Sequence, residues 1–299
     1  MKLAVYQVDS FTTRPFEGNP AGVIPHADGL DEETMQRIAR EIKASETAFI
    51  INRGGEGYDL EVRFFTPTRE VPICGHATVA AHYVYALEHG IANGTILQKT
   101  KAGILPVEIG PEDGDLRVSM TQAGVEFGAI IEGGRRAAFL AALGIGEAEL
   151  EPSLPIQIVS TGHGKVMVPL RAKDTLDGLK PDAAGLSALS AEIGCNGYYT
   201  FTLDSREEGV LACGRMFAPA IGIYEDPVTG NANGPLGAYL THYGRIPGRP
   251  DGYSFRIKQG EAMGRPGYMD VQIFSGDEGP RLVKIGGRAR VVFKGELLM

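Results

Sequence analysis

An internal repeat restricts the fold of this chain more than any other feature of its sequence. Residues 63–67, which read Arg-Phe-Phe-Thr-Pro, lead through a short loop to a small-residue helix that begins at Gly75. About 155 residues further along, residues 215–219, Arg-Met-Phe-Ala-Pro, lead to a second small-residue helix that begins at Gly230. Beyond each helix a matching pair of strand-like segments follows, 99–103 with 107–109 and 257–260 with 271–273.

Coincidence among common residue types is the alternative to duplication, but three features recur in one order. Duplication predicts two similar α+β domains, each with strands wrapped around a buried helix. We expect an N-terminal domain over residues 1–125 and a C-terminal domain over 126–299, with the last strand a candidate to cross back to the first domain. The cleft between duplicated halves is the natural place for a ligand, so we expect the site there.

Hydrophobic periodicity predicts the individual elements. A helix is expected over 31–43, where Met35, Ile38 and Ile42 recur at helical spacing, and an all-round apolar, buried helix over 75–87, ended by Gly90. Further helices are expected at 135–143 and 186–193. Strands are expected at 3–8, 47–52, 60–66, 96–100, 105–109, 116–120, 156–160, 165–170, 197–203 and 211–217, and over most of 255–294.

Composition narrows the possible partners. The 41 glycines among 299 residues are roughly twice the usual ~7% share, yet no low-complexity run contains them, so they belong to folded structure. The formal charge of −8 and the scattered basic residues argue against nucleic acid or an anionic membrane as a partner. Because the first residues lack the apolar core of a signal peptide and no stretch of about 18 apolar residues occurs, we expect a cytoplasmic protein.

The motifs of common cofactor and metal sites do not occur. The chain has no G-x-G-x-x-G after a strand, no G-x-x-x-x-G-K-[ST] and no H-E-x-x-H. Its cysteines, Cys74, Cys195 and Cys213, are too few and too dispersed for a disulfide scaffold or a four-cysteine zinc site. We therefore expect no metal ion.

Each repeated loop brings the chain to a helix start with glycine, at Gly75 and at Gly230. Free backbone N–H groups and the helix dipole make such positions suitable for a carboxylate. The alternative, which stays open, is that these glycines only allow close packing of helix on strand.

Three ionisable residues near these loops are candidates for chemistry. Glu46 comes just before an apolar strand; in a closed cleft, burial would raise its pKa and let it exchange a proton near neutral pH, whereas on a surface it has no role. His76 and Asp226 stand at the two helix starts and are either functional or capping residues. Four further residues either contact substrate or pack: Arg14, Arg215, Tyr198 and Tyr199.

Several motifs together resemble the phenazine-biosynthesis isomerase family (PhzF-like), and especially its YddE-type branch of uncharacterised bacterial members. They are Asp9-Ser10-Phe11, Phe16 with Gly18-Asn19-Pro20-Ala21-Gly22-Val23, Ser45-Glu46-Thr47-Ala48-Phe49, Arg63-Phe64-Phe65-Thr66-Pro67, Cys74-Gly75-His76-Ala77-Thr78 and Glu225-Asp226-Pro227-Val228-Thr229-Gly230.

The resemblance implies a diaminopimelate-epimerase-like α+β fold, in which each of two pseudo-symmetric domains curls a mostly antiparallel sheet around a central helix. It also implies a homodimer and a reaction that moves a proton on a dihydro-hydroxyanthranilate without metal, pyridoxal phosphate or nucleotide, so that no cofactor is expected. The acid/base glutamate of the family falls on Glu46, its cleft histidine on His76 and its substrate-contacting aspartate on Asp226. The implied substrate-binding residues are Asn19, Gly75, Gly230 and Asn231, of which Asn231 replaces a serine common in the family.

The resulting hypothesis is a cofactor-independent isomerase in which Glu46 moves a proton on a small carboxylate metabolite. Related racemases use two cysteines, one at each central helix start, and here only Cys74 is present, which disfavours a two-thiol mechanism. An epimerase that uses Cys74 with Glu46 remains an alternative. A non-catalytic metabolite-binding protein with the same fold is the other.

Overall fold

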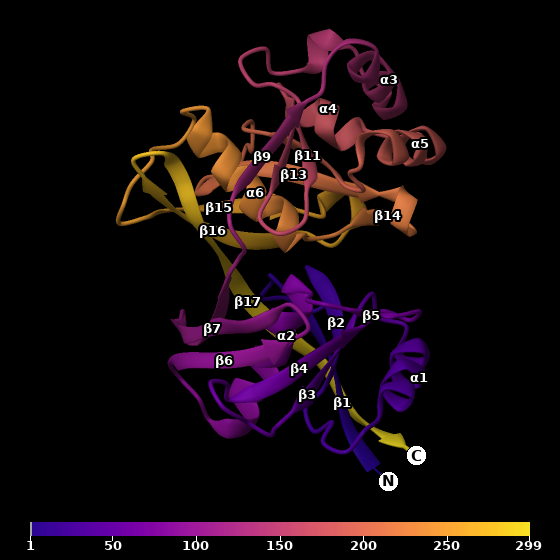
Figure 1. The fold of residues 1–299 in the computed structure, drawn as a ribbon, viewed down its shortest axis with the longest axis vertical. Helices are drawn as coiled ribbons and strands as arrows, with labels where there is room; N and C mark the ends of the chain where they lie inside the picture. Colours follow the sequence, from indigo (N-terminus) through magenta and orange to yellow (C-terminus); the bar gives the residue numbers. More distant parts are fainter. Residues whose placement is uncertain (1) are drawn as a thin grey trace. The chain divides into compact units, whose positions relative to one another are not determined.

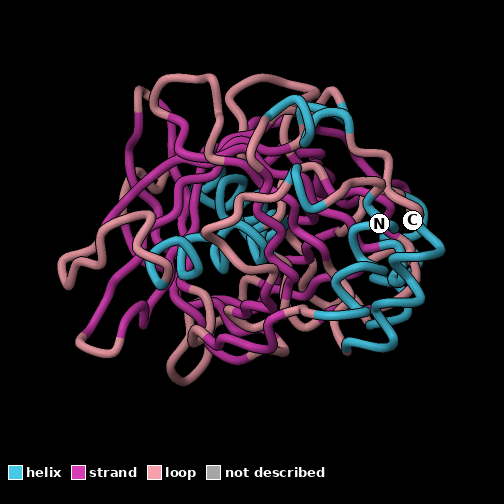
Figure 2. The backbone as a smooth tube through the Cα atoms, turned by 90° about the horizontal axis from the view of Figure 1, so that it is seen from above, coloured by secondary structure: helices cyan, strands magenta, loops and turns pink. Residues whose placement is uncertain are grey.

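The computed structural model describes residues 2–299, and the chain divides into two compact units. Unit 1 comprises Met1–Thr121 and Gly286–Met299, and unit 2 comprises Gln122–Ile285. We propose that these units are the two domains expected from the sequence. Strands make up more of the backbone than helices do, as the magenta and cyan segments of Figure 2 show.

The elements of unit 1, all but β8 labelled in Figure 1, follow one another along the chain: β1 (Lys2–Ser10), β2 (Asn19–Ile24), α1 (Glu32–Ile42), β3 (Thr47–Ile51), β4 (Leu60–Phe65), β5 (Glu70–Val71), α2 (Gly75–His89), β6 (Gly94–Thr100), β7 (Gly103–Glu112) and β8 (Asp115–Thr121).

Those of unit 2 are β9 (Glu126–Ile130), α3 (Gly133–Leu143), β10 (Gln157–Ser160), β11 (Lys165–Leu170), α4 (Lys173–Gly178), α5 (Ala183–Ile193), β12 (Tyr198–Thr202), β13 (Val210–Ala218), β14 (Ile223–Asp226), α6 (Gly230–His242), β15 (Tyr253–Gln259) and β16 (Gly267–Gly276). The last strand, β17 (Gly279–Leu298), begins in unit 2 and ends in unit 1.

The two units pair their strands in the same pattern. In unit 1, β1 and β2 are antiparallel, β2 and β3 parallel, β3 and β4 antiparallel, β4 and β6 parallel, and β6 and β7 antiparallel. In unit 2 the strands β10, β11, β12, β13, β15 and β16 repeat this series of directions. The duplication predicted from the sequence is therefore present in the topology.

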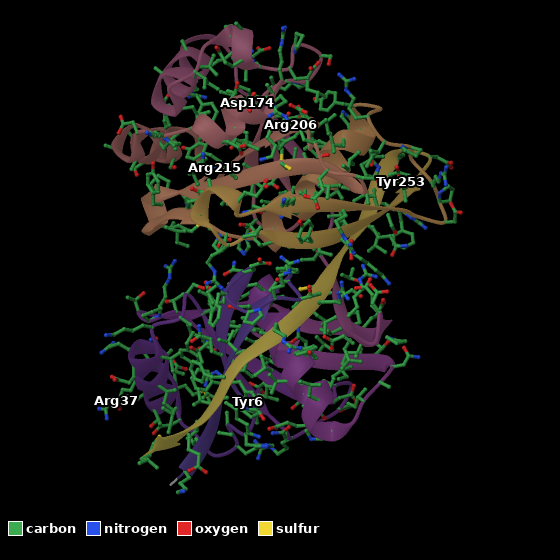
Figure 3. The ribbon with its side chains drawn as sticks, turned by 180° about the vertical axis from the view of Figure 1, so that it is seen from behind. Tyr6, Arg37, Asp174, Arg206, Arg215 and Tyr253 are labelled. Atoms are coloured by element: carbon green, nitrogen blue, oxygen red, sulfur yellow. The ribbon has the colours of Figure 1, made fainter. Side chains whose placement is uncertain are left out.

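A partly buried ion pair between arginine and glutamate recurs with the duplication. Arg63 on β4 donates two hydrogen bonds to Glu70, of 2.8 and 2.6 Å, and Arg215 on β13 donates two to Glu225, of 2.9 and 2.8 Å. Arg215, labelled in Figure 3, also donates to the carbonyl of Leu176. Of the two roles left open for Arg215, the structure shows packing.

One helix contacts several strands in each unit. In unit 1, α2 contacts β1, β2, β3, β7 and β8, and in unit 2, α6 contacts β10, β11 and β16. Small residues make this closeness possible: a Cβ on Gly237 of α6 would lie 2.6 Å from Cδ1 of Ile273 and 2.9 Å from Cγ1 of Val271. The helix α2 ends where Gly90 takes a left-handed conformation with φ of 64°, as its sequence position predicts.

The remaining helices cover other apolar faces. The helix α1 is capped by Asp31, which accepts from the N–H of Thr34, and it buries Met35 and Ile38 in a cluster that includes Phe49. In unit 2, α3 and α5 pack together over a second cluster. Tyr198 belongs to that cluster and Tyr199 is fully buried, so both pack.

The sequence did not predict some short elements. The strands β2, β5, β9 and β14 and the helix α4 lie in segments that were left without assignment. Of these, β2 begins at Asn19-Pro20, which reads as a turn, and β5 has two residues, too few to show periodicity. Pairing with neighbouring strands, which local sequence does not reveal, forms them.

Candidate active site

Glu46 is held at the start of β3 by the strand beside it. The N–H of Gly22 donates a hydrogen bond of 3.0 Å to the Glu46 carbonyl, next to the parallel pairing of β2 and β3. A Cβ on Gly22 would lie 2.8 Å from Oγ1 of Thr47, so only glycine allows this approach. The motif that contains Gly22 and the motif that contains Glu46 therefore contact each other in the folded chain.

His76 lies in the first turn of α2 and is 8% exposed. Its backbone carbonyl accepts a hydrogen bond of 2.7 Å from Oγ of Ser10, which is fully buried. The end of β1, which carries Ser10, thereby fixes the start of the helix and with it the direction of the imidazole.

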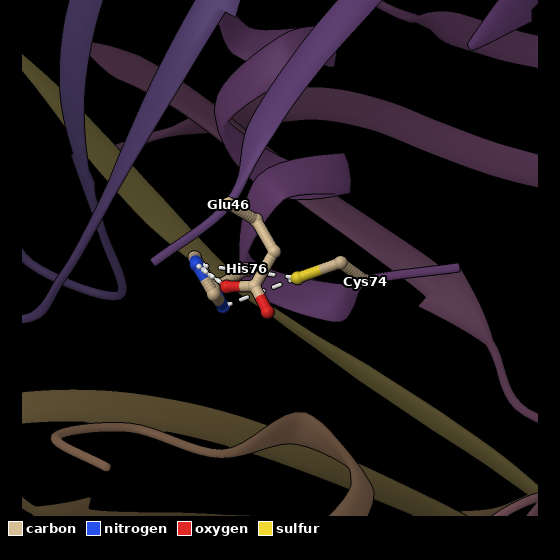
Figure 4. Close-up of side chains that lie close together, drawn as sticks. All are labelled: Glu46, Cys74 and His76. Atoms are coloured by element: carbon tan, nitrogen blue, oxygen red, sulfur yellow. Dashed lines mark hydrogen bonds and ion pairs between the residues drawn. The ribbon is translucent and has the colours of Figure 1, made fainter. Parts of the chain in front are cut away.

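Three chemically active side chains converge in unit 1, as Figure 4 shows. Nε2 of His76 lies 3.3 Å from Oε2 of Glu46, and Nδ1 of His76 lies 3.4 Å from Sγ of Cys74. Oγ of Ser45 lies 3.3 Å from Nε2 of His76. We call Glu46, Cys74 and His76 the carboxylate–thiol–imidazole cluster.

Burial governs the acidity of Glu46, whose side chain is 16% exposed. Loss of hydration raises the pKa of Glu46, while hydrogen bonds from Ser45 and Cys74 stabilise the charged form and act in the opposite direction. The net shift is upward. A carboxyl group with a raised pKa beside an imidazole is suited to take and return protons near neutral pH.

The cluster also has the composition of a partial metal site. One carboxylate oxygen, one thiol sulfur and one imidazole nitrogen lie within 4.8 Å of one another. Zinc accepts all three ligand types. The sequence-based expectation that the protein uses no metal ion stays a prediction.

In unit 2, Asp226 ends β14 and is followed by the loop to α6. Oγ1 of Thr229 donates a hydrogen bond to the Asp226 carboxylate. Gln259, which is 1% exposed, donates to the Asp226 carbonyl at 2.8 Å and accepts from the Thr229 N–H at 3.1 Å. Its amide oxygen also accepts from Asn233 at 2.9 Å. These contacts hold the Asp226 loop in one conformation.

The other candidates occupy definite places. Gly75 and Gly230 are the first residues of α2 and α6. Asn231 follows Gly230 with φ of −80° and ψ of 16°, which interrupts the helical conformation there. Asn19 begins β2 in unit 1 and is buried. The structure therefore groups Glu46 with His76 in unit 1, and Asp226 with Gly230 and Asn231 in unit 2.

Sequence reasoning did not single out Ser45, Gln259 or Asn233 for a role. A signal existed for Gln259, because it lies in the second copy of a repeated segment. Its function as a clamp depends on Thr229, 30 residues away, and only the fold reveals it.

Comparison with known proteins shows the family. Residues 8–295 match the family described as phenazine biosynthesis-like protein. The chain is 49% identical to the uncharacterised isomerase YddE of Escherichia coli, over 99% of this chain and 98% of that one. It is 33% identical to a trans-2,3-dihydro-3-hydroxyanthranilate isomerase of Pseudomonas fluorescens, over 98% of both. The chain belongs to the PhzF-like family of isomerases, as its motifs predicted.

Comparison with solved structures leads to the same family and fold. A PhzF-family protein of Bacillus anthracis matches with a TM-score of 0.90 and 33% identity, and the match covers 100% of both chains. A hydroxyproline epimerase of Agrobacterium vitis matches with a TM-score of 0.63 over 99% of this chain and 92% of that one. At 13% identity the second likeness shows the fold alone. The predicted epimerase-like α+β fold and the isomerase class are thus confirmed, and no helix among residues 2–299 is long and apolar enough to cross a membrane.

Proposed function

We propose that this protein is a cofactor-independent isomerase that moves a proton on a small carboxylate metabolite, with Glu46 as the general acid and base. The observation that carries this proposal is the buried pair of Glu46 and His76, whose ionisable atoms lie 3.3 Å apart. Burial and the upward shift of the Glu46 pKa support the same role.

The proposed step balances without a cofactor. The Glu46 carboxylate takes a proton from a carbon of the substrate, and the electrons of that C–H bond move into the adjacent unsaturated system. The Glu46 carboxyl then returns the proton to another carbon of the same molecule. His76, held by Ser10, orients Glu46 and exchanges protons with it.

The remaining predicted residues bind the substrate in this proposal. The N–H groups at the starts of α2 and α6, next to Gly75 and Gly230, favour a carboxylate and developing negative charge. Asp226 and Asn231 contact polar groups of the substrate, and the hydrogen bonds of Gln259 keep the Asp226 loop ready for this. Asn19 is the further binding residue taken from the family.

Deuterium transfer from solvent tests the proposal. The wild-type protein is incubated in D₂O with a small-molecule extract and with trans-2,3-dihydro-3-hydroxyanthranilate, the compound in the relative's name. We expect one carboxylate to gain deuterium, as mass spectrometry detects. Glu46→Gln abolishes the gain, while Glu41→Gln, a matched change at an exposed glutamate on α1, leaves it unchanged. Full exchange by the Glu46→Gln variant, or none by the wild type with any compound, contradicts the proposal.

An epimerase that uses Cys74 with Glu46 is the second candidate function. It is favoured by the thiol of Cys74, which hydrogen-bonds to Glu46 and lies 3.4 Å from Nδ1 of His76. Cys74→Ser distinguishes the two: it eliminates an epimerase activity on amino acids and leaves the Glu46-dependent isomerisation largely intact. A ligand that binds tightly without any proton exchange would favour the non-catalytic alternative.

We further propose a homodimer that acts in the cytoplasm, as the resemblance and the composition led us to expect. Light scattering on the purified protein measures the oligomeric state. A mass of one chain, 31.9 kDa, contradicts the dimer.

A further inference from the structure

The register of the strands defines which residue of unit 2 corresponds to Glu46. In unit 1 the carbonyl of Glu46 accepts from the N–H of Gly22, one residue before Thr47 pairs with Gly22. In unit 2 the carbonyl of Gly197 accepts from the N–H of Val166, one residue before Tyr198 pairs with Val166. Gly197 therefore has the backbone position that Glu46 has in the first copy.

The side chain of Lys165 fills the space that Gly197 leaves. A Cβ on Gly197 would lie 2.3 Å from Cδ and 2.7 Å from Cε of Lys165, and 2.6 Å from Cε of Met216. Met216 pairs across the sheet with Asp226. The lysine stem thus passes over Gly197, beside the strand that leads to the Asp226 loop. Where one copy carries a carboxylate, the other carries an ammonium group.

Lys165 is buried with few partners. The residue is 8% exposed, and its Nζ donates a hydrogen bond of 3.1 Å to the carbonyl of Gly164. Among residues 2–299 this is its one hydrogen bond, although an ammonium group has three donors. Burial lowers the pKa of Lys165, and the nearby acidic group of Asp226 acts in the opposite direction. A buried charge with unused donors is costly, so the arrangement points to an anionic ligand.

We infer that Lys165 is a further substrate-binding residue, whose ammonium group receives the carboxylate of the ligand next to the Asp226 loop. This inference rests on the proposed function, because it assumes a small organic acid as substrate. It adds a fixed cation on the β11 side of unit 2 to the helix start at Gly230. The ligand class is then an organic anion, and an uncharged compound of the same shape binds more weakly because it leaves donors of the buried ammonium group without an acceptor.

Calorimetric titration with anthranilate, a stable aromatic carboxylate, and with aniline, which lacks the carboxylate, tests the inference. The wild type should bind anthranilate and not aniline. Lys165→Met should weaken anthranilate binding about 10- to 100-fold, the effect expected when a hydrogen bond to a charged group is lost. Lys180→Met, which removes an exposed lysine charge from the same unit, should bind like the wild type.

Gly197→Ala provides a second variant that keeps the charge. Its Cβ displaces the Lys165 stem, so anthranilate binding should weaken even though the lysine remains. Equal binding of anthranilate by the wild type and Lys165→Met, or no binding by the wild type, overturns the inference.

Glu46→Gln is expected to retain anthranilate binding while losing proton exchange. Full exchange in that variant, with binding lost in Lys165→Met, overturns only the proposed function.

Discussion

Nε2 of His76 lies 3.3 Å from the carboxylate of Glu46, although the two residues come from different elements and are 30 positions apart. His76 lies in the first turn of α2, and Glu46 lies directly before β3. If the imidazole orients the carboxylate and shares its proton, His76→Phe should lower the rate of proton exchange by about 10²-fold or more. The rate of deuterium uptake measures this. His89→Phe, at an exposed histidine of the same helix, is the matched control and should have no effect.

The raised pKa of Glu46 makes the stability of the protein depend on pH. Because the folded state holds this proton more tightly than the unfolded chain does, Glu46 adds stability below its unfolded pKa of about 4.3. That contribution is lost as the pH rises through the raised folded pKa. The Glu46→Gln variant lacks this titration, so it should exceed the wild type in stability at neutral pH by about 1 kcal/mol.

Urea unfolding of both proteins between pH 4 and pH 8 measures the difference. The gap should grow with pH and be smallest in the acidic samples. Glu41→Gln should follow the wild type at every pH. A variant that is less stable than the wild type at neutral pH would show that the ionised carboxylate is stabilised in the fold.

The sequence alone revealed the parts of this structure that depend on local pattern or on repetition. The helix after Asp31 and the helix ended by Gly90 carry their boundary signals in the chain, and the repeat predicts the duplicated topology. The candidates Glu46 and His76 came from the chain as well, but their proximity depends on the pairing of β2 with β3.

Other features lay beyond sequence reasoning because distant residues create them. Gly197 carries no side chain, and the need for glycine at this position follows from the Lys165 side chain, which occupies the space beside it. Arg215 looked as suited to a substrate as to packing until Glu225 was found beside it. The role of a polar residue such as Arg215 depends on which residues it contacts in the fold.

The clamp on the Asp226 loop should contribute strongly to stability. Gln259→Leu removes hydrogen bonds to the Asp226 carbonyl, the Thr229 N–H and Asn233, and leaves their buried groups unpaired. We expect a loss of about 3 kcal/mol, because several buried bonds of about 1 kcal/mol each disappear at once. Thermal unfolding measures the loss.

Gln98 of β6 provides the matched control for that variant. It is also fully buried, but neither atom of its amide has a hydrogen-bond partner among residues 2–299. Gln98→Leu should therefore leave the stability unchanged or increase it, since an apolar group replaces an unsatisfied polar one. If both variants lose the same stability, the hydrogen bonds of Gln259 are not the reason.

Zinc ions should inhibit the enzyme at the carboxylate–thiol–imidazole cluster. Glu46, Cys74 and His76 offer three donor atoms within 4.8 Å of one another, and a zinc ion bound there would occupy the group that moves the proton. Deuterium uptake should fall when Zn²⁺ is added, and Mg²⁺, which prefers oxygen ligands, should have little effect. Cys74→Ser should weaken the inhibition, and dialysis against EDTA should leave the activity of the untreated protein unchanged. Activity that disappears with EDTA and returns with Zn²⁺ would instead show that the reaction requires the metal.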